Sequence, residues 1–247
     1  MRGVSLQVTS LLLLLALWTL IALMTQTETL PTPWQVFLRI GGELNRGDLL
    51  SHCLITLGRV AAAFILAMAV GSAIGLYLGL HKTADRFFDP WLLVMLNLPA
   101  LVVIILCYLW IGLNEVAAVL AVALNKIPNV AVTLREGAKA LDRDLLEMAR
   151  CYRLSRSTTL KAVIWPQLTP FIAAAARSGL ALVWKIVLVV ELLGRSNGVG
   201  FQLHLYFQLF DVTGILAYSL AFIVIIWGIE QGLIRPWERR VNRWRDA

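Results

Sequence analysis

Apolar residues run in long blocks along the chain, and short polar segments separate the blocks. Five blocks are about 19–24 residues long, close to the ~20 residues that a helix needs to cross a bilayer. They lie at residues 57–80, 88–111, 116–134, 171–194 and 212–234. An earlier block at 11–24 is long enough to cross a bilayer when its flanking residues are included. We interpret it as an uncleaved helix rather than a removed signal peptide, because no clean small-residue cleavage site follows it. The pattern predicts an all-α membrane protein with six spans.

Proline and glycine positions refine three of these spans. We expect Pro99 to interrupt the third and Pro128 the fourth, because proline removes a backbone donor inside a helix. Gly71, Gly75 and Gly79 recur at every fourth residue, which places them on one helix face. Small residues in such a row let two helices approach closely. The second span is therefore predicted to pack tightly against a neighbour.

Between the first two spans lies a polar segment, residues 30–51, which starts with Leu30-Pro31-Thr32-Pro33. Its larger apolar residues have helical spacing, at Trp34, Phe37, Leu38 and Leu44, with Gly41 on the same face. This pattern is typical of an amphipathic helix that lies along the membrane interface rather than crossing it. We place this segment on the outer side.

Composition excludes several classes of protein. Apolar residues make up 59% of the 247 residues and charged residues 15%, against ~25% charged in an ordinary soluble domain. A soluble globule, a disordered chain and a secreted disulfide scaffold are all disfavoured. The three cysteines are odd in number and far apart, so they indicate neither a disulfide framework nor a metal site.

The net charge of +7 is explained by where the cations fall. With the N-terminus inside, the inner segments hold fifteen of the 22 Lys and Arg residues, as cytoplasmic loops do. We therefore expect both termini in the cytoplasm and the protein in a bacterial inner membrane. The basic run at 235–245 follows a span directly, so we interpret it as a membrane anchor and expect no nucleic-acid partner.

The inner segment at residues 135–170 is the longest and is predicted to form two helices. Asp142 can cap the first helix, Ser155 or Ser157 can cap the second, and Pro166 is expected to end it. An interfacial brace and a docking site for a soluble partner both fit such a pair.

This segment resembles the signature of the membrane subunits of binding-protein-dependent ABC importers. Glu147-Met148-Ala149 matches the opening triplet of that signature, and Val163 and Pro166 stand at its expected offsets. Arg153 occupies a position where the family has glycine, so either a left-handed arginine or a different turn is expected there. The resemblance implies an ATPase-coupling loop with these residues: Glu147, Met148, Ala149, Arg153, Ser155, Val163 and Pro166.

The resemblance covers nearly the whole chain as a single permease domain, 1–247, with the type I ABC importer permease fold. It is closest to the sulfonate, taurine and nitrate type. The matching segments are Leu30-Pro31-Thr32-Pro33, Thr56-Leu57-Gly58-Arg59, Asp89-Pro90, Leu98-Pro99-Ala100, Trp110-Ile111-Gly112 with Glu115, Glu191-Leu192-Leu193-Gly194 and Gly198-Val199-Gly200-Phe201. Ala63 and Ala175 replace glycines of that pattern.

What the chain lacks implies its partners. It has no Gly-x-x-x-x-Gly-Lys-Ser/Thr loop for binding nucleotide phosphates. We therefore expect two separate ATP-binding subunits to use the ATP and Mg. This chain itself is expected to bind no cofactor and no metal and to have no catalytic residue. The resemblance further implies an extracytoplasmic substrate-binding protein. Six spans form half of a two-fold pathway, so we expect a homodimer that works by alternating access.

Ionisable residues inside spans are candidates for the substrate pathway, because charge is costly there. Lys126 and Lys185 lie at membrane depth and would suit an anion; Lys126 pairing with Glu115 or Glu191 is the alternative. Arg177, Trp184 and Glu191 are spaced by seven and share a helix face. We expect that face to meet the subunit partner or to hold an internal ion pair, with pathway lining as the second role. Arg59 is interpreted as an interface anchor, and His52, His81 and His204 as ordinary loop residues.

The sequence thus favours an ATP-driven importer of a small anion such as a sulfonate, taurine or nitrate. Similar permeases also carry thiamine-precursor pyrimidines and aromatic acids. An ion-gradient-driven secondary transporter is the alternative from another class, since broken spans and buried charges suit it too. A membrane-embedded enzyme is less favoured, because no span carries a metal or nucleophile motif.

Overall fold

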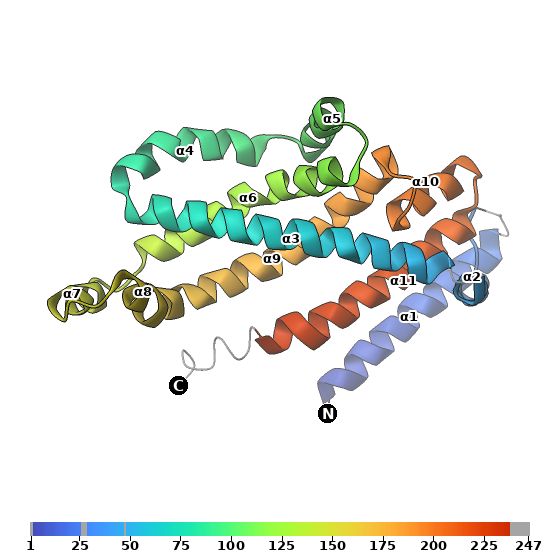
Figure 1. Cartoon of the computed structure of the whole chain (residues 1–247). Coiled ribbons are helices and arrows are strands. Elements are labelled where there is room, and N and C mark those ends of the chain that lie inside the picture. Colours follow the sequence, from blue (N-terminus) through green and yellow to red (C-terminus); the bar gives the residue numbers. More distant parts are fainter. Residues whose placement is uncertain (1, 26–28, 47, 238–247) are drawn as a thin grey trace.

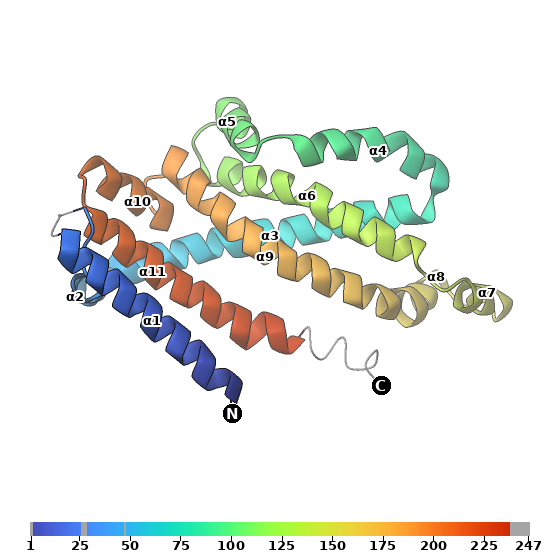
Figure 2. The same cartoon turned by 180° about the vertical axis from the view of Figure 1, so that it is seen from behind.

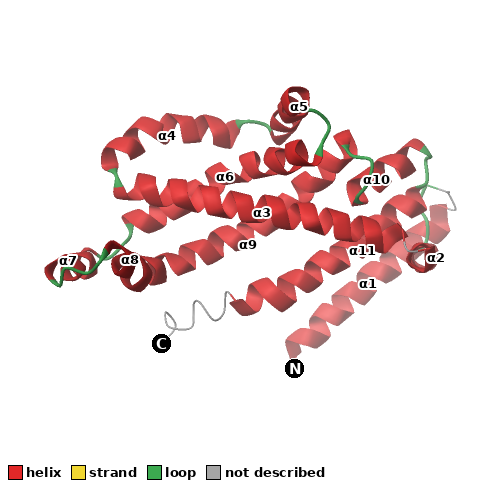
Figure 3. Ribbon diagram, viewed as in Figure 1, coloured by secondary structure: helices red, strands yellow, loops and turns green. Residues whose placement is uncertain are grey.

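The computed structural model describes residues 2–25, 29–46 and 48–237, and every regular element among them is a helix (Figure 3). The basic run at 235–245 lies mostly outside these residues. The helices are α1 (Arg2–Thr25), α2 (Pro33–Arg46), α3 (Asp48–Leu80), α4 (Lys82–Asn97), α5 (Ala100–Ile111), α6 (Glu115–Lys139), α7 (Arg143–Cys151), α8 (Arg156–Thr159), η1 (Leu160–Ile164, a π-helix), α9 (Trp165–Gly194), α10 (Val199–Gln208), α11 (Val212–Ile229) and η2 (Glu230–Ile234, also a π-helix).

The long helices lie side by side and define two ends of the molecule. Helix α6 is central and packs against α3, α9, α5 and α4, while α11 packs against α2 and α10 (Figures 1 and 2). Helices α7 and α8 project at one end, which we call the α7–α8 end, and α2 and α10 lie at the other, the α2–α10 end. The sites described below lie at these ends and between α3, α6 and α9.

Helices α3 and α6 are in close contact through the predicted glycine row. A β-carbon built on Gly71 would stand 2.6 Å from the Cβ atom of Val130. One built on Gly75 would overlap the carbonyl oxygen of Ala131, and one on Gly79 would overlap the side chain of Ala138. The expectation of close packing by the second span is confirmed.

The predicted spans correspond to five long apolar helices and one bent pair. Helices α4 and α5 meet at 95°, and Pro99 stands at the N-cap of α5, so the predicted break in the third span is confirmed. The predicted break at Pro128 is wrong, because α6 runs through it from Glu115–Lys139. Pro128 and Val130 are buried, and packing against the neighbouring helices holds the α6 backbone helical despite the missing donor.

Helix ends differ from the predicted boundaries in two places. The second span begins at Asp48, nine residues before the predicted start, so the predicted 30–51 segment contains the shorter helix α2 and also the first residues of α3. At the other end, α6 reaches Lys139 and α9 starts at Trp165, which shortens the predicted 135–170 loop.

Pro166 does not end the second helix of that loop, as the sequence had suggested. The chain passes from α8 through the π-helix η1 into α9, and the Trp165 N–H donates to the Leu160 carbonyl. A π-turn widens the backbone just before the proline ring, which removes the clash that would stop an α-helix.

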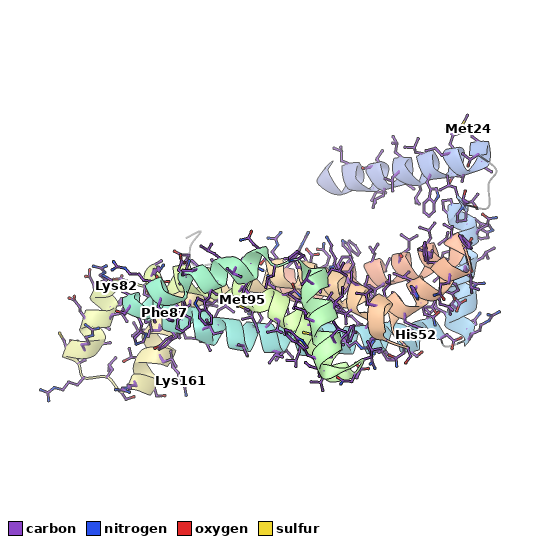
Figure 4. The ribbon with its side chains drawn as sticks, turned by 90° about the horizontal axis from the view of Figure 1, so that it is seen from above. Met24, His52, Lys82, Phe87, Met95 and Lys161 are labelled. Carbon is purple, nitrogen blue, oxygen red and sulfur yellow. The ribbon has the colours of Figure 1, made fainter. Side chains whose placement is uncertain are left out.

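Helix α1 stands apart from the other helices along most of its length (Figure 4). It is joined to α2 near Met24, where the Trp18 indole donates to the Pro31 carbonyl at 3.1 Å. Its leucine side chains are exposed in the single chain, as expected for a helix whose surroundings are lipid or another protein.

Candidate functional site

A buried ion network closes the α2–α10 end, and Glu191 on α9 lies at its centre. The Glu191 carboxylate is fully buried and accepts three hydrogen bonds, from Arg59 Nη1 at 2.7 Å, Thr56 Oγ1 at 2.9 Å and the Gly200 N–H at 2.8 Å. Buried carboxylates are tolerated when charge and lone pairs are satisfied in this way. Glu191 therefore joins α3 to α9 and α10.

Arg59 extends this network from α3 to α6. Its Nε and Nη2 atoms donate to the two oxygens of Glu115 at 2.8 and 2.7 Å, a bidentate geometry. Glu115 also accepts from Arg195, just after α9, and Arg195 donates to the Leu113 carbonyl at 2.9 Å. Hydrogen bonding by Arg59 satisfies both carboxylates, so α3, α6 and α9 are clamped together at one level.

The loop between α9 and α10 is held down by the same residues. Arg59 Nη1 donates to the Asn197 carbonyl at 2.9 Å, the Val199 N–H donates to Thr56 Oγ1 at 2.8 Å, and the Gly198 N–H donates to His52 Nδ1 at 2.9 Å. Gly198 has φ +104°, and a β-carbon there would overlap the Glu191 carboxylate. Glycine is thus required by both the backbone angle and the space.

Two sequence interpretations are wrong at this end. Arg59 is not an interface anchor, because it is 5% exposed and bound to both glutamates. His52 and His204 are helical rather than loop residues, in α3 and α10, while His81 stands between α3 and α4. The sequence did carry a signal for the network: Arg59 and Glu191 are opposite charges near the same end of two spans, and such charges favour each other in the membrane.

A second, smaller cluster fixes α2. Glu43, 5% exposed, forms an ion pair with Arg39, whose Nε lies 3.1 Å from the carboxylate. Glu43 accepts hydrogen bonds from the Tyr206 hydroxyl at 3.3 Å and from the Tyr218 hydroxyl at 3.4 Å. Burial raises the pKa of the Tyr206 hydroxyl, so it stays a donor. The polar face of α2 is therefore docked onto α10 and α11.

Lys126 is in the middle of α6, and its side chain lies between α3, α6 and α9 with 3% exposure. Its Cε and Nζ atoms pass over Gly179 of α9, whose missing side chain leaves the space, and Phe64 of α3 flanks them. Both glutamates proposed as partners are engaged by Arg59 instead. Within the part of the chain that the structure describes, the Lys126 side chain makes no ion pair or hydrogen bond.

Two of the predicted pathway residues line one groove between α9 and α11. This groove, of about 420 Å³, is bordered by Arg177, Ser178 and Trp184 from α9 and by Ile226 and Glu230. The Lys185 ammonium lies 5.6 Å from the centre of the Trp184 ring, and the side chain is exposed. The structure thus brings Arg177 and Trp184 to one groove and places Lys185 against Trp184, while neither Lys126 nor Glu191 lines this groove.

The two-helix segment at the α7–α8 end has the predicted caps. Asp142 accepts from the N–H groups of Asp144 and Leu145, and Ser155, rather than Ser157, accepts from Thr158. Arg153 has φ +51°, so of the two turns considered the left-handed one is present. The Leu154 N–H donates to the Ala149 carbonyl and the Arg153 N–H to the Arg150 carbonyl, which together form a Schellman motif.

The coupling residues implied by the resemblance divide into buried and exposed groups. Ala149 and Val163 are buried, at 2% and 7% exposure, where α7 packs against η1. Leu146 and Ile164 pack onto the cluster around Leu134 and Leu168, which anchors the segment to the bundle. Glu147 and Met148 remain exposed, as does Pro166. A partner could therefore reach the exposed residues without unfolding the segment.

A bundle of spanning helices, with a helical segment projecting at one end and a buried ion network at the other, is the architecture of a polytopic membrane permease. The chain belongs to the family of binding-protein-dependent transport system inner membrane components, whose model matches residues 51–229. It is thus the permease subunit of an ABC transporter, and such a subunit works with an ATP-binding partner and a binding protein.

Curated relatives and solved structures agree with this assignment. The chain is 28% identical to the aliphatic sulfonates transport permease SsuC of Bacillus subtilis, over 95% of this chain and 85% of that one. It is also 28% identical to the taurine transport permease TauC of Escherichia coli, over 98% and 90%. The inward-facing MetNI methionine ABC transporter superposes with a TM-score of 0.69 at 15% identity, covering 81% and 98% of the chains, so the shared fold is that of an importer permease. A secondary transporter receives no support.

Proposed function

We propose that this permease carries a small anion, such as a sulfonate, taurine or nitrate, across the inner membrane. The observation that carries the proposal is Lys126, a cation buried at membrane depth beside Gly179 with no counter-ion among the described residues. A charge held in this environment is costly unless an opposite charge reaches it. A passing anion would supply that charge.

The names of the relatives are consistent with such cargo. Sulfonates and taurine carry a sulfonate group, and a bicarbonate transport permease of Synechococcus elongatus is 25% identical over 73% of this chain and 65% of that one. These cargoes differ in size and share a compact anionic group. A single buried lysine would suit this common feature better than a shape-specific pocket would.

The groove with Arg177 and Trp184 supports a homodimer of this chain. It opens between α9 and α11, and Lys185 projects next to it, so a second copy facing α9 would enclose both cations in a shared passage. Two-fold symmetry would then present each residue twice. We assign Arg177, Trp184 and Lys185 to that passage and Glu191 to its closure at the α2–α10 end.

Two ATP-binding subunits would dock at the α7–α8 end. Glu147 and Met148 are exposed there, while Ala149 and Val163 keep α7 fixed on η1, and the Arg153 turn sets the angle between the helices. Closure of the ATP-bound partners would move both segments as rigid bodies. Because α9 runs from this segment to Glu191, the motion would reach the ion network at the far end. Both termini lie in the cytoplasm in this orientation.

The anion proposal is tested by reconstituting the complete transporter with Lys126→Met and Lys185→Met, singly and together. We expect Lys126→Met to raise the KM for anion uptake about tenfold, in line with the loss of one charged contact. Assembly and basal ATP hydrolysis should be unchanged, and Lys126→Arg should restore part of the uptake. Unaltered affinity and rate in the double variant would refute the proposal, and a ligand screen of the cognate binding protein would name the cargo.

A further inference from the structure

A groove of about 500 Å³ lies at the α7–α8 end, away from the proposed pathway. It is bordered by the ends of α3, α4 and α6 and by one face of α7. Four of its side chains are cations, Lys82, Lys139, Arg143 and Arg150, and two are anions, Asp85 and Glu147. The groove therefore has a net positive charge of two.

Pairing inside the groove leaves most of this positive charge uncompensated. Asp85 forms ion pairs with Lys139 Nζ at 2.9 Å and with Arg135 Nη1 at 3.1 Å. No ion pair or hydrogen bond joins the side chain of Lys82, Arg143 or Arg150 to any other described residue. Glu147 is then the one groove carboxylate left to face three cations.

These three cations come from two separate elements and converge on one space. Arg143 and Arg150 are seven residues apart on α7 and so share its face, and Lys82 begins α4. A phosphate group has enough oxygens to accept from several such donors at once, whereas a carboxylate has two. A bound phosphate would tie α7 to the corner between α3 and α4.

Aromatic side chains place this groove at the depth of lipid headgroups. Phe87, Phe88 and Trp91 form an exposed ring cluster on α4 next to Lys82, with centroids 4.9 and 5.7 Å apart. Figure 4 shows Lys82 and Phe87 at the same end as Lys161 and opposite His52. Exposed tryptophans are enriched at the membrane–water interface, and Trp91 is such a residue. Leu80, Leu141 and Leu146 supply an apolar border to the cationic groove.

We propose that this groove binds a phosphate group, supplied by the headgroup of an anionic phospholipid of the adjacent leaflet. Basic pockets between spanning helices are suited to such headgroups. Binding there would brace α7 against the membrane helices. The assignment of the leaflet as cytoplasmic rests on the proposed orientation, whereas the phosphate site itself does not depend on the cargo.

The test uses the full chain assembled with its ATP-binding partner in nanodiscs of phosphatidylglycerol and phosphatidylcholine. Arg143→Gln/Arg150→Gln removes two groove cations, and Arg156→Gln/Lys161→Gln is the matched control, since both its residues are exposed on α8 and η1 outside the groove. Native mass spectrometry counts retained phosphatidylglycerol. We expect about tenfold weaker retention in the groove variant and no change in the control.

A second arm separates the two sources of phosphate. Millimolar inorganic phosphate is added to the complex in detergent, and the thermal midpoint is recorded. Suppose that phosphate raises the thermal midpoint, that only the groove variant abolishes this rise, and that the wild-type protein retains no phosphatidylglycerol selectively. The phosphate site would then be supported, and its ligand would be free phosphate. Arg143→Lys/Arg150→Lys should retain binding, which excludes misfolding as the cause of its loss. Equal loss in both double variants, or loss in neither, would overturn the site; failure of anion uptake in the Lys126 experiment would leave it standing.

Discussion

Arg59 on α3 and Glu191 on α9 form an ion pair 2.7 Å long at the α2–α10 end, and neither side chain is more than 5% exposed. The pair joins two spanning helices, and Arg59 also donates to the Asn197 carbonyl in the loop between α9 and α10. A buried pair of this kind need not add much stability over an apolar pair, but removal of one partner leaves an uncompensated charge.

Glu191→Gln is therefore expected to destabilise the permease by about 3 kcal/mol, because Arg59 keeps only Glu115 as a charged partner. The change in the free energy of unfolding is measured by unfolding the purified protein in mixed micelles with increasing SDS. Glu136→Gln is the control, since Glu136 is half exposed and pairs with Lys139 at the surface, where ion pairs contribute about 0–1 kcal/mol. Equal losses in the two variants would show that the Arg59–Glu191 pair is not a structural lock.

Gly198→Ala should disturb the same closure without removing a charge. The left-handed φ of +104° and the overlap with Glu191 both disfavour a β-carbon, so the loop must move off the network. We expect raised basal ATP hydrolysis in the reconstituted transporter and a lower thermal midpoint. Gly42→Ala is the control because a β-carbon there meets no atom within 4 Å; wild-type behaviour of Gly198→Ala would argue against the loop as part of the closure.

Arg153→Gly should stabilise the turn between α7 and α8. A side chain at φ +51° costs about 1 kcal/mol that glycine avoids. The thermal midpoint is expected to rise by a few degrees. Arg153→Ala separates backbone conformation from charge: it removes the guanidinium and keeps the β-carbon, so it should give no such gain. If alanine stabilises as much as glycine, charge rather than backbone strain is responsible.

Cysteine labelling tests the proposed orientation with the native residues. Cys151 is exposed at the end of α7, while Cys53 and Cys107 are buried. With the permease expressed alone, a membrane-impermeant maleimide should label inverted vesicles and spare intact spheroplasts. The Cys151→Ser variant should not be labelled in either preparation. Labelling of Cys151 from the outside would reverse the assigned sidedness and place both termini outside.

Glu147→Lys tests docking of the ATP-binding subunits at α7. The side chain is exposed, so the substitution should leave the permease folded while reversing the charge that a partner meets. We expect weaker co-purification of the ATP-binding subunit and loss of substrate-stimulated ATP hydrolysis, with Glu147→Gln intermediate. Wild-type assembly and stimulation in Glu147→Lys would count against this segment as the coupling site.

The amino-acid sequence by itself determined the class of protein and most of its helices. Long apolar blocks identify spans because the bilayer requires about 20 residues per crossing, and the row of Gly71, Gly75 and Gly79 identifies a close helix contact. Pro99 and the caps at Asp142 and Ser155 were readable because they depend on local backbone geometry. The family was indicated by a resemblance, carried by Glu147-Met148-Ala149, Val163 and Pro166 in one loop.

Only the tertiary structure decided whether two prolines end a helix and which charges meet. Pro128 stays inside α6 and Pro166 follows a π-turn, since packing on neighbouring helices outweighs a local preference. Arg59 pairs with Glu191 and Glu115, 132 and 56 residues away, so no periodicity in the sequence could show it. The same pairing leaves Lys126 alone among α3, α6 and α9. Charges that are distant along the chain become partners through helix packing, and that packing fixed the closure, the buried lysine and the cationic groove.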